Sequence, residues 1–108
     1  MNSRQKGKRG ELELVHVLKA RGFEVRRGQQ YCGGNGDADV VGIEGLHIEC
    51  KRVEKINLQQ ALDQARNDAR LGEVPVVMHR KNKEEWKVTM AIADFLELWR
   101  LHNDKVSN

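Results

Sequence analysis

The chain has 108 residues, of which 32% are charged and 39% are hydrophobic, with a net charge of +3 and a pI near 9.0. This length suits one domain with a modest core, and the balance of charged and apolar residues excludes a disordered chain. No apolar run approaches the roughly 20 residues of a membrane span, and the basic N-terminus lacks the apolar segment of a signal peptide. We therefore expect a cytoplasmic protein with no membrane partner, and the positive charge favours a polyanionic one. Its two cysteines have no CxxC spacing, which indicates reduced thiols and no zinc site.

The first predicted element is a helix from about Arg4 to Arg21. Ser3 suits the N-cap position, and Gly22 followed by an apolar residue is typical of a helix that ends at a glycine. Four basic side chains lie in the turns that lead toward the middle of this helix, interleaved with glycines. A solvated face and contacts with DNA phosphates both account for them. They are Arg4, Lys6, Lys8 and Arg9.

Glu11 lies three and four residues before Leu14 and Val15, so it belongs to the end of the apolar stripe of this helix. Glu13 falls on the predicted solvated face. Taken alone, Glu11 is better explained as a capping or salt-bridging glutamate. A role in a metal site becomes reasonable only beside the strands that follow.

The stretch from Gly36 to Arg52 predicts two short strands joined by a turn at Glu44-Gly45. Because side chains alternate between the faces of a strand, Glu49 and Lys51 share one face of the second strand. Asp39, on the first strand, projects toward the same end of the sheet. Two carboxylates beside an ammonium group are costly against an apolar sheet unless they bind something. A divalent cation would satisfy both.

A short strand at 23–27 and a loop at 28–36 with four glycines precede this pair. No helical pattern follows the glycines, so the loop does not fit a phosphate-binding motif and no nucleotide cofactor is expected. Asn57 is placed to cap a second helix from Leu58 to about Leu71, which carries Gln64. Strands follow at 74–79 and 85–90. A last helix opens at Ala93 or Asp94, with an expected inner face of Phe95, Leu96, Trp99 and His102.

The predicted order is helix, three strands, helix, two strands, helix. It indicates an α/β fold in a single domain over residues 1–108, with a mixed central sheet flanked by helices. The ends, 1–3 and 104–108, are expected to fray. The carboxylates then cluster where the early strands meet the first helix.

Asp39, nine intervening residues and then Glu49-Cys50-Lys51 resemble the signature of the PD-(D/E)xK nuclease superfamily. Ala38 departs from the proline in that name, and we assign this position to backbone shape only. The segments 8–11 and 21–23 look like the first helix of the Holliday junction resolvases in the superfamily, and 75–90 resembles small phage-encoded proteins of that kind. The similarity covers about residues 6–98.

This resemblance implies a restriction-endonuclease-like fold and a metal-dependent endonuclease that resolves four-way DNA junctions by paired nicks. It implies that Asp39 and Glu49 ligate Mg²⁺ or Mn²⁺, with the main-chain carbonyl of Cys50 as a further oxygen ligand. Glu11 would bind the same or a second ion, directly or through water. The Cys50 side chain itself is expected in the core, on the opposite face of the strand.

By the same resemblance, Lys51 would position or help deprotonate the attacking water, and Gln64 would brace the site. Arg52 joins the basic residues of the first helix as a candidate DNA contact. Paired nicks need two active sites in a fixed relation, so a C2 homodimer is expected. None of the four histidines is placed as an obvious ligand, and His16 and His47 are assigned no role.

Two other functions stay open on the sequence alone. The same chemistry would serve a structure-selective nuclease that nicks flaps or duplex DNA. The basic N-terminus also suits a non-catalytic DNA-binding module, although the acid, acid and lysine set argues against it.

Overall fold

The computed structural model describes residues 3–29 and 38–107, and these contain three helices and five strands. The helices are α1 (Ser3–Ala20), α2 (Leu58–Asp68) and α3 (Ile92–Ser107). The strands are β1 (Arg26–Arg27), β2 (Val40–Val41), β3 (Leu46–Arg52), β4 (Val74–Arg80) and β5 (Lys87–Thr89). Most of the loop expected at 28–36 lies outside the described residues.

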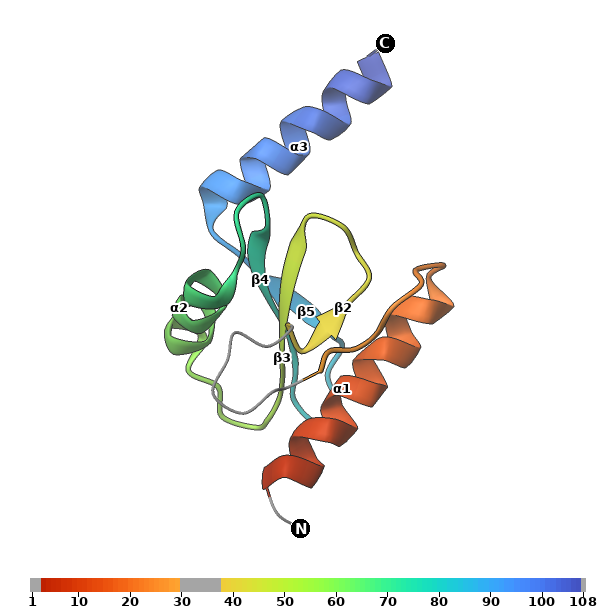
Figure 1. The fold of residues 1–108 in the computed structure, drawn as a ribbon, viewed down its shortest axis with the longest axis vertical. Coiled ribbons are helices and arrows are strands. Elements are labelled where there is room, and N and C mark those ends of the chain that lie inside the picture. Colours follow the sequence, from red (N-terminus) through yellow and green to blue (C-terminus); the bar gives the residue numbers. More distant parts are fainter. Residues whose placement is uncertain (1–2, 30–37, 108) are drawn as a thin grey trace.

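The five strands form one sheet in the order β1-β2-β3-β4-β5. β3 and β4 are parallel and are connected through α2, whereas the other neighbouring strands are antiparallel. In Figure 1, α1 and α2 flank the sheet from opposite sides. The predicted α/β fold, with a mixed sheet between helices and this order of elements, is therefore confirmed.

Alternation along the strands divides the apolar side chains between the two faces of the sheet. On the face toward α1, the buried side chains of Leu14 and Val15 pack with those of Val40, Ile48 and Val76. On the opposite face, α2 packs onto the sheet through the smaller cluster of Ala61, Leu62 and Val77. The alanines on α2 allow the helix to lie close to β4.

Several local signals act as the sequence predicts. α1 ends at Gly22, which has φ of +93°, and the Phe23 amide donates to the Leu18 carbonyl in the pattern of a glycine-terminated helix. The Asn57 side chain caps α2 by accepting the Gln60 amide at 3.0 Å. Gly45 adopts φ of +86° in the turn between β2 and β3.

Some boundaries differ from the prediction. α1 already includes Ser3, and β1 covers only Arg26–Arg27, the two residues that pair with β2. α2 ends at Asp68 and not near residue 71, since a tight turn follows in which Arg70 and Glu73 exchange hydrogen bonds. β5 is shorter than 85–90, and α3 continues to Ser107, past the expected polar tail.

The expectation that α3 packs inward is wrong. Phe95, Leu96 and Trp99 are each about half exposed (51%, 48% and 52%), and His102 is exposed as well. Figure 1 shows α3 projecting away from the sheet. Periodicity identified an apolar stripe on this helix, but it carries no information about which surface covers that stripe. Among the described residues, no helix is long and apolar enough to cross a membrane.

Candidate metal centre

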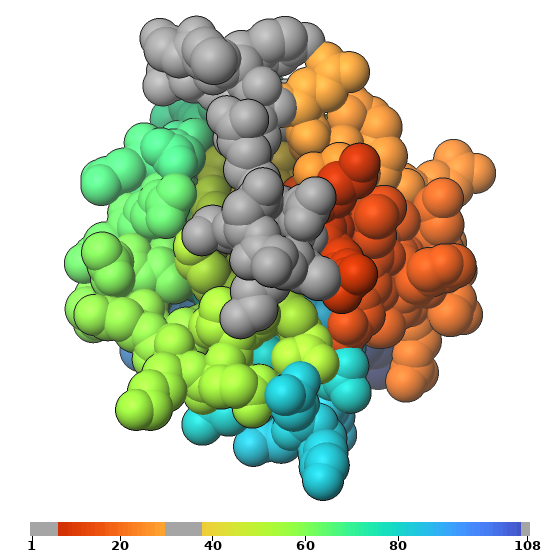
Figure 2. Space-filling model, turned by 90° about the horizontal axis from the view of Figure 1, so that it is seen from below, coloured from red at the N-terminus to blue at the C-terminus, as the bar shows by residue number. Residues whose placement is uncertain are grey.

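A cavity of about 350 Å³ opens where the C-terminal half of β3 faces the N-terminal half of α1. The structure brings to this one cavity every residue that was predicted to act in catalysis or metal binding. It is lined by Gly7, Glu11, Asp39, Glu49, Cys50, Lys51, Arg52, Val53 and Gln64. Figure 2 views the molecule from below, with α1 in red and orange on one side and α2 in green on the other.

Asp39 is anchored between β2 and β3. Its backbone amide donates to the Ile48 carbonyl at 3.0 Å, and its Oδ2 accepts the Cys50 amide at 2.8 Å. Burial raises the pKa of Asp39 to about 7, and the adjacent Glu49 carboxylate adds to the shift. The two side chains therefore lie close enough that a negative charge on one carboxylate disfavours ionisation of the other.

Glu49 lies on β3 with only 5% of its surface exposed. Its Oε1 is 2.9 Å from Nε2 of His47, which is buried on the same face of the strand. The other ring nitrogen of His47, Nδ1, lies 3.7 Å from the Glu73 carboxylate. The hydrogen bond to Glu49 raises the pKa of His47. This contact was not predicted from the sequence, although the spacing of two residues between His47 and Glu49 places both side chains on one face of the strand.

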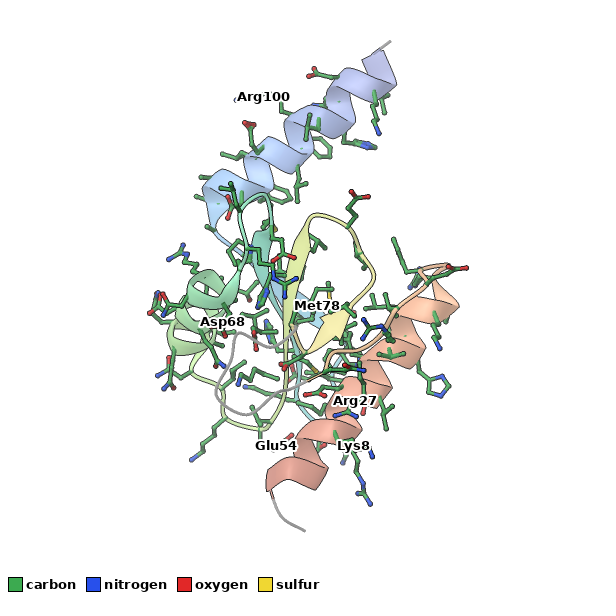
Figure 3. All side chains as sticks on the ribbon, in the orientation of Figure 1. Lys8, Arg27, Glu54, Asp68, Met78 and Arg100 are labelled. Carbon is green, nitrogen blue, oxygen red and sulfur yellow. The ribbon has the colours of Figure 1, made fainter. Side chains whose placement is uncertain are left out.

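Glu11 reaches the cavity because α1 comes very close to β3 at Gly10. Gly10 is buried, and a Cβ there would lie 2.6 Å from the Cβ of Arg52. Glu11 accepts a hydrogen bond at 3.0 Å from Nε of Arg27, in β1. Figure 3 labels Arg27 among the side chains between α1 and the sheet. Arg27 was not singled out from the sequence, because it lies 16 residues from Glu11 and no short-range pattern connects the two.

Lys51 and Gln64 complete the wall of the cavity from β3 and α2. Lys51 is half-buried and follows Glu49 on the same face, while Gln64 is exposed at the rim. Both also line an adjacent cavity of about 230 Å³. The Cys50 side chain packs against the core on the α1 face, as predicted, and burial raises the pKa of its thiol.

The basic residues fall into two groups. Lys8 and Arg9 are exposed on α1, and Figure 3 shows Lys8 near the N-terminal end of that helix. Arg4 and Lys6 belong to the same helix, with side chains outside the described residues. Arg52 is instead engaged within the protein, where it contacts Asn82 at 2.9 Å and Glu13 at 3.4 Å.

Glu13 is the centre of this second group, and its placement on a solvated face was wrong. It accepts hydrogen bonds from Arg52, from Arg80 and, at 3.1 Å, from the indole of Trp86. Arg80 and Arg52 lower the pKa of Glu13 and outweigh its partial burial. This network ties α1 to β3 and β4, and it adjoins the cavity through Arg52, which also lines it.

The donor set of the cavity fits a hard divalent cation. Carboxylates and backbone carbonyls are the ligands of Mg²⁺ and related ions, and a cation would offset both the burial and the repulsion from Glu49 that raise the pKa of Asp39. Glu49 also belongs to a group with His47 and Asp68 whose ligand atoms all lie within 4.8 Å of one another. Glu49 therefore has a neighbouring carboxylate on two sides, Asp39 in the cavity and Asp68 beside His47.

A mixed sheet that carries two acids and a lysine at the edge of a cavity defines the PD-(D/E)xK class of nucleases. Residues 2–100 match the family model described as archaeal Holliday junction resolvase (Hjc). The chain belongs to this family and is a junction-resolving nuclease. The sequence had suggested a phage-type resolvase, and the family shown is the archaeal one.

The fold is also similar to that of a solved structure, the Holliday junction resolvase Hjc of the archaeal hyperthermophile Archaeoglobus fulgidus. The TM-score is 0.53 at 24% sequence identity, over 79% of this chain and 72% of that chain. At this identity the similarity supports the fold alone. No curated protein matches this chain.

Proposed function

We propose that this single domain is a Mg²⁺- or Mn²⁺-dependent endonuclease that resolves four-way DNA junctions by paired nicks. The observation that carries the proposal is the pair of neighbouring carboxylates, half-buried Asp39 and buried Glu49, in a cavity that Lys51 also lines. Such a pair is costly unless a cation binds it.

In this proposal Asp39 and Glu49 are the direct ligands and the Cys50 carbonyl is a third. Glu11 contributes directly or through a water molecule, and Arg27 holds its carboxylate in place. A bound divalent ion would supply Lewis acidity and an activated water for phosphodiester hydrolysis. Mg²⁺ and Mn²⁺ fit this oxygen-rich set better than softer metals do.

Lys51 acts in the same cavity, on the face of β3 that carries Glu49. Its ammonium group would orient the attacking water and stabilise the negative charge that develops on the phosphate in the transition state. Gln64 braces the rim from α2, where it lines the same cavity as Lys51.

DNA reaches the cavity over the N-terminal half of α1. Lys8 and Arg9 are exposed there, and the basic run of this helix also contains Arg4 and Lys6. Contacts of this kind position phosphates without reading bases, which suits recognition of branched DNA by shape. Arg52 would contribute mainly by holding α1 against β3. Such an enzyme acts where DNA is, which for this chain we place in the cytoplasm, that of the host if the chain is phage-encoded.

Two nicks on one junction require two copies of the site, and we propose that α3 provides the dimer contact. Its apolar residues recur at helical spacing on a helix that leaves the sheet. Ile92, Phe95 and Trp99 are 74%, 51% and 52% exposed. A second copy related by a twofold axis would bury the same stripe on both chains.

The test is cleavage of a labelled four-way junction in Mg²⁺ or Mn²⁺, compared with a flap and a linear duplex. The wild type is expected to cut the junction in paired strands, and Glu49→Gln, which keeps the shape of the side chain, is expected to lose that activity. Glu24→Gln, which changes an exposed carboxylate away from the cavity, is the matched control. No metal-dependent product would reject the proposal, and equal rates on all three substrates would reject its junction specificity.

A further inference from the structure

His47 is a buried polar residue that the proposed mechanism does not use. Its side chain is 4% exposed and lies on the face of β3 that turns toward α2. Its register partner in β4 is Pro75, and the Asp68 and Glu73 carboxylates also lie near the ring. A buried imidazole is costly unless its nitrogens find partners. Its partner at 2.9 Å is the Glu49 carboxylate.

One oxygen of the Glu49 carboxylate is occupied by the hydrogen bond with His47. An ionised carboxylate only accepts hydrogen bonds, so Nε2–H of His47 donates to Oε1. The other oxygen, Oε2, remains for Asp39 and the cavity. Neither partner can turn easily, since Glu49 is 6% exposed and the Glu73 carboxylate flanks the far side of the ring. The backbone of both residues belongs to one continuous strand.

We propose that His47 is a positioning residue of the metal centre. It holds Glu49 so that a single carboxylate oxygen faces the cation, which leaves space on the cation for water. This inference rests on the proposed function. Residues that orient metal ligands in this way typically change metal affinity about 10- to 100-fold when they are replaced.

The experiment measures Mn²⁺ binding by calorimetry to the full chain without DNA. His47→Leu is expected to raise the Kd for Mn²⁺ about 10- to 100-fold, and His47→Gln, which keeps an N–H donor, is expected to recover most of the loss. In cleavage assays, excess Mn²⁺ should restore the rate of His47→Leu. His79→Leu is the control, because it removes a comparable 2.8 Å histidine contact, to Thr89 of β5, without touching Glu49. Its Kd for Mn²⁺ should equal that of the wild type.

The outcomes separate the inference from the function on which it rests. Absence of Mn²⁺ binding by the wild type would overturn the proposed metal centre itself. A wild-type Kd in His47→Leu, or equal losses in His47→Leu and His47→Gln, would overturn the positioning role alone. Thermal unfolding of each variant shows which are folded. If His47→Leu fails to fold, His47→Met, which also lacks an N–H donor, replaces it, and a wild-type Kd in that variant would overturn the positioning role.

Discussion

The close approach of α1 to β3 predicts opposite effects for two glycines on one helix. Replacing glycine by alanine inside a helix gains up to about 1 kcal/mol of stability. At Gly7 no atom lies within 4 Å of the new methyl group, so Gly7→Ala is expected to be neutral or stabilising. At Gly10 the methyl group would lie 2.6 Å from the Cβ of Arg52, which is fixed to the backbone of β3. Overpacking of this kind costs about 1–3 kcal/mol.

The difference in unfolding free energy between Gly7→Ala and Gly10→Ala isolates that overlap, because the helix-propensity gain is shared. We expect Gly10→Ala to be less stable by about 1–3 kcal/mol in urea denaturation. Junction cleavage should also fall in Gly10→Ala, since the shift of α1 moves Glu11 away from Asp39. Equal stabilisation by both substitutions would refute the packing of α1 on β3 described above.

Three further predictions concern other parts of the molecule. Protonation of Asp39, whose pKa is raised to about 7, competes with metal binding. The affinity for Mn²⁺ should therefore rise about tenfold per pH unit up to pH 7 and then level off. A flat calorimetric profile from pH 5.5 to 8.5 would contradict this expectation. Gly42→Ala should destabilise the fold by about 1–3 kcal/mol in thermal or urea unfolding. Gly42 has φ of +126°, and a Cβ there would lie 2.3 Å from the Glu24 carbonyl oxygen, so unchanged stability would rule out this backbone geometry. Trp99→Asp should convert a dimer to a monomer in sedimentation experiments with a stability change of no more than about 0.5 kcal/mol, and a dimer that persists would exclude α3 as the contact.

The parts of the fold that short-range chemistry controls could be predicted from the sequence. Gly22 ends a helix because its backbone adopts positive φ, and Asn57 begins one because its side chain caps an amide. Alternation along β3 was enough to bring Glu49 and Lys51 to one face. The spacing from Asp39 then matched a nuclease signature, and the structure gathers these residues in one cavity.

The remaining features depend on contacts between distant segments. Glu13 was misplaced because its partners Arg52, Arg80 and Trp86 follow it by 39, 67 and 73 residues. Arg27 meets Glu11 only after β1 has packed beside α1. Helical periodicity identifies the apolar face of a helix, but it does not show which distant residues contact the polar face.

The apolar stripe of α3 illustrates a different limit. Its residues Phe95 and Trp99 have the spacing of a helix that packs on a core, but in this chain the sheet ends before α3 begins. The stripe is exposed in the single chain because α3 projects away from the sheet (Figure 1). Sequence periodicity does not distinguish a stripe that is buried within one chain from one that is buried between two.

The most direct test of the metal centre is a crystal of the protein soaked in Mn²⁺, with the ion located by anomalous scattering. The proposed function predicts a peak coordinated by the carboxylates of Asp39 and Glu49, with the Cys50 carbonyl in its coordination shell. A peak confined to the His47 and Asp68 side of Glu49, or no peak between the two acids, would contradict it.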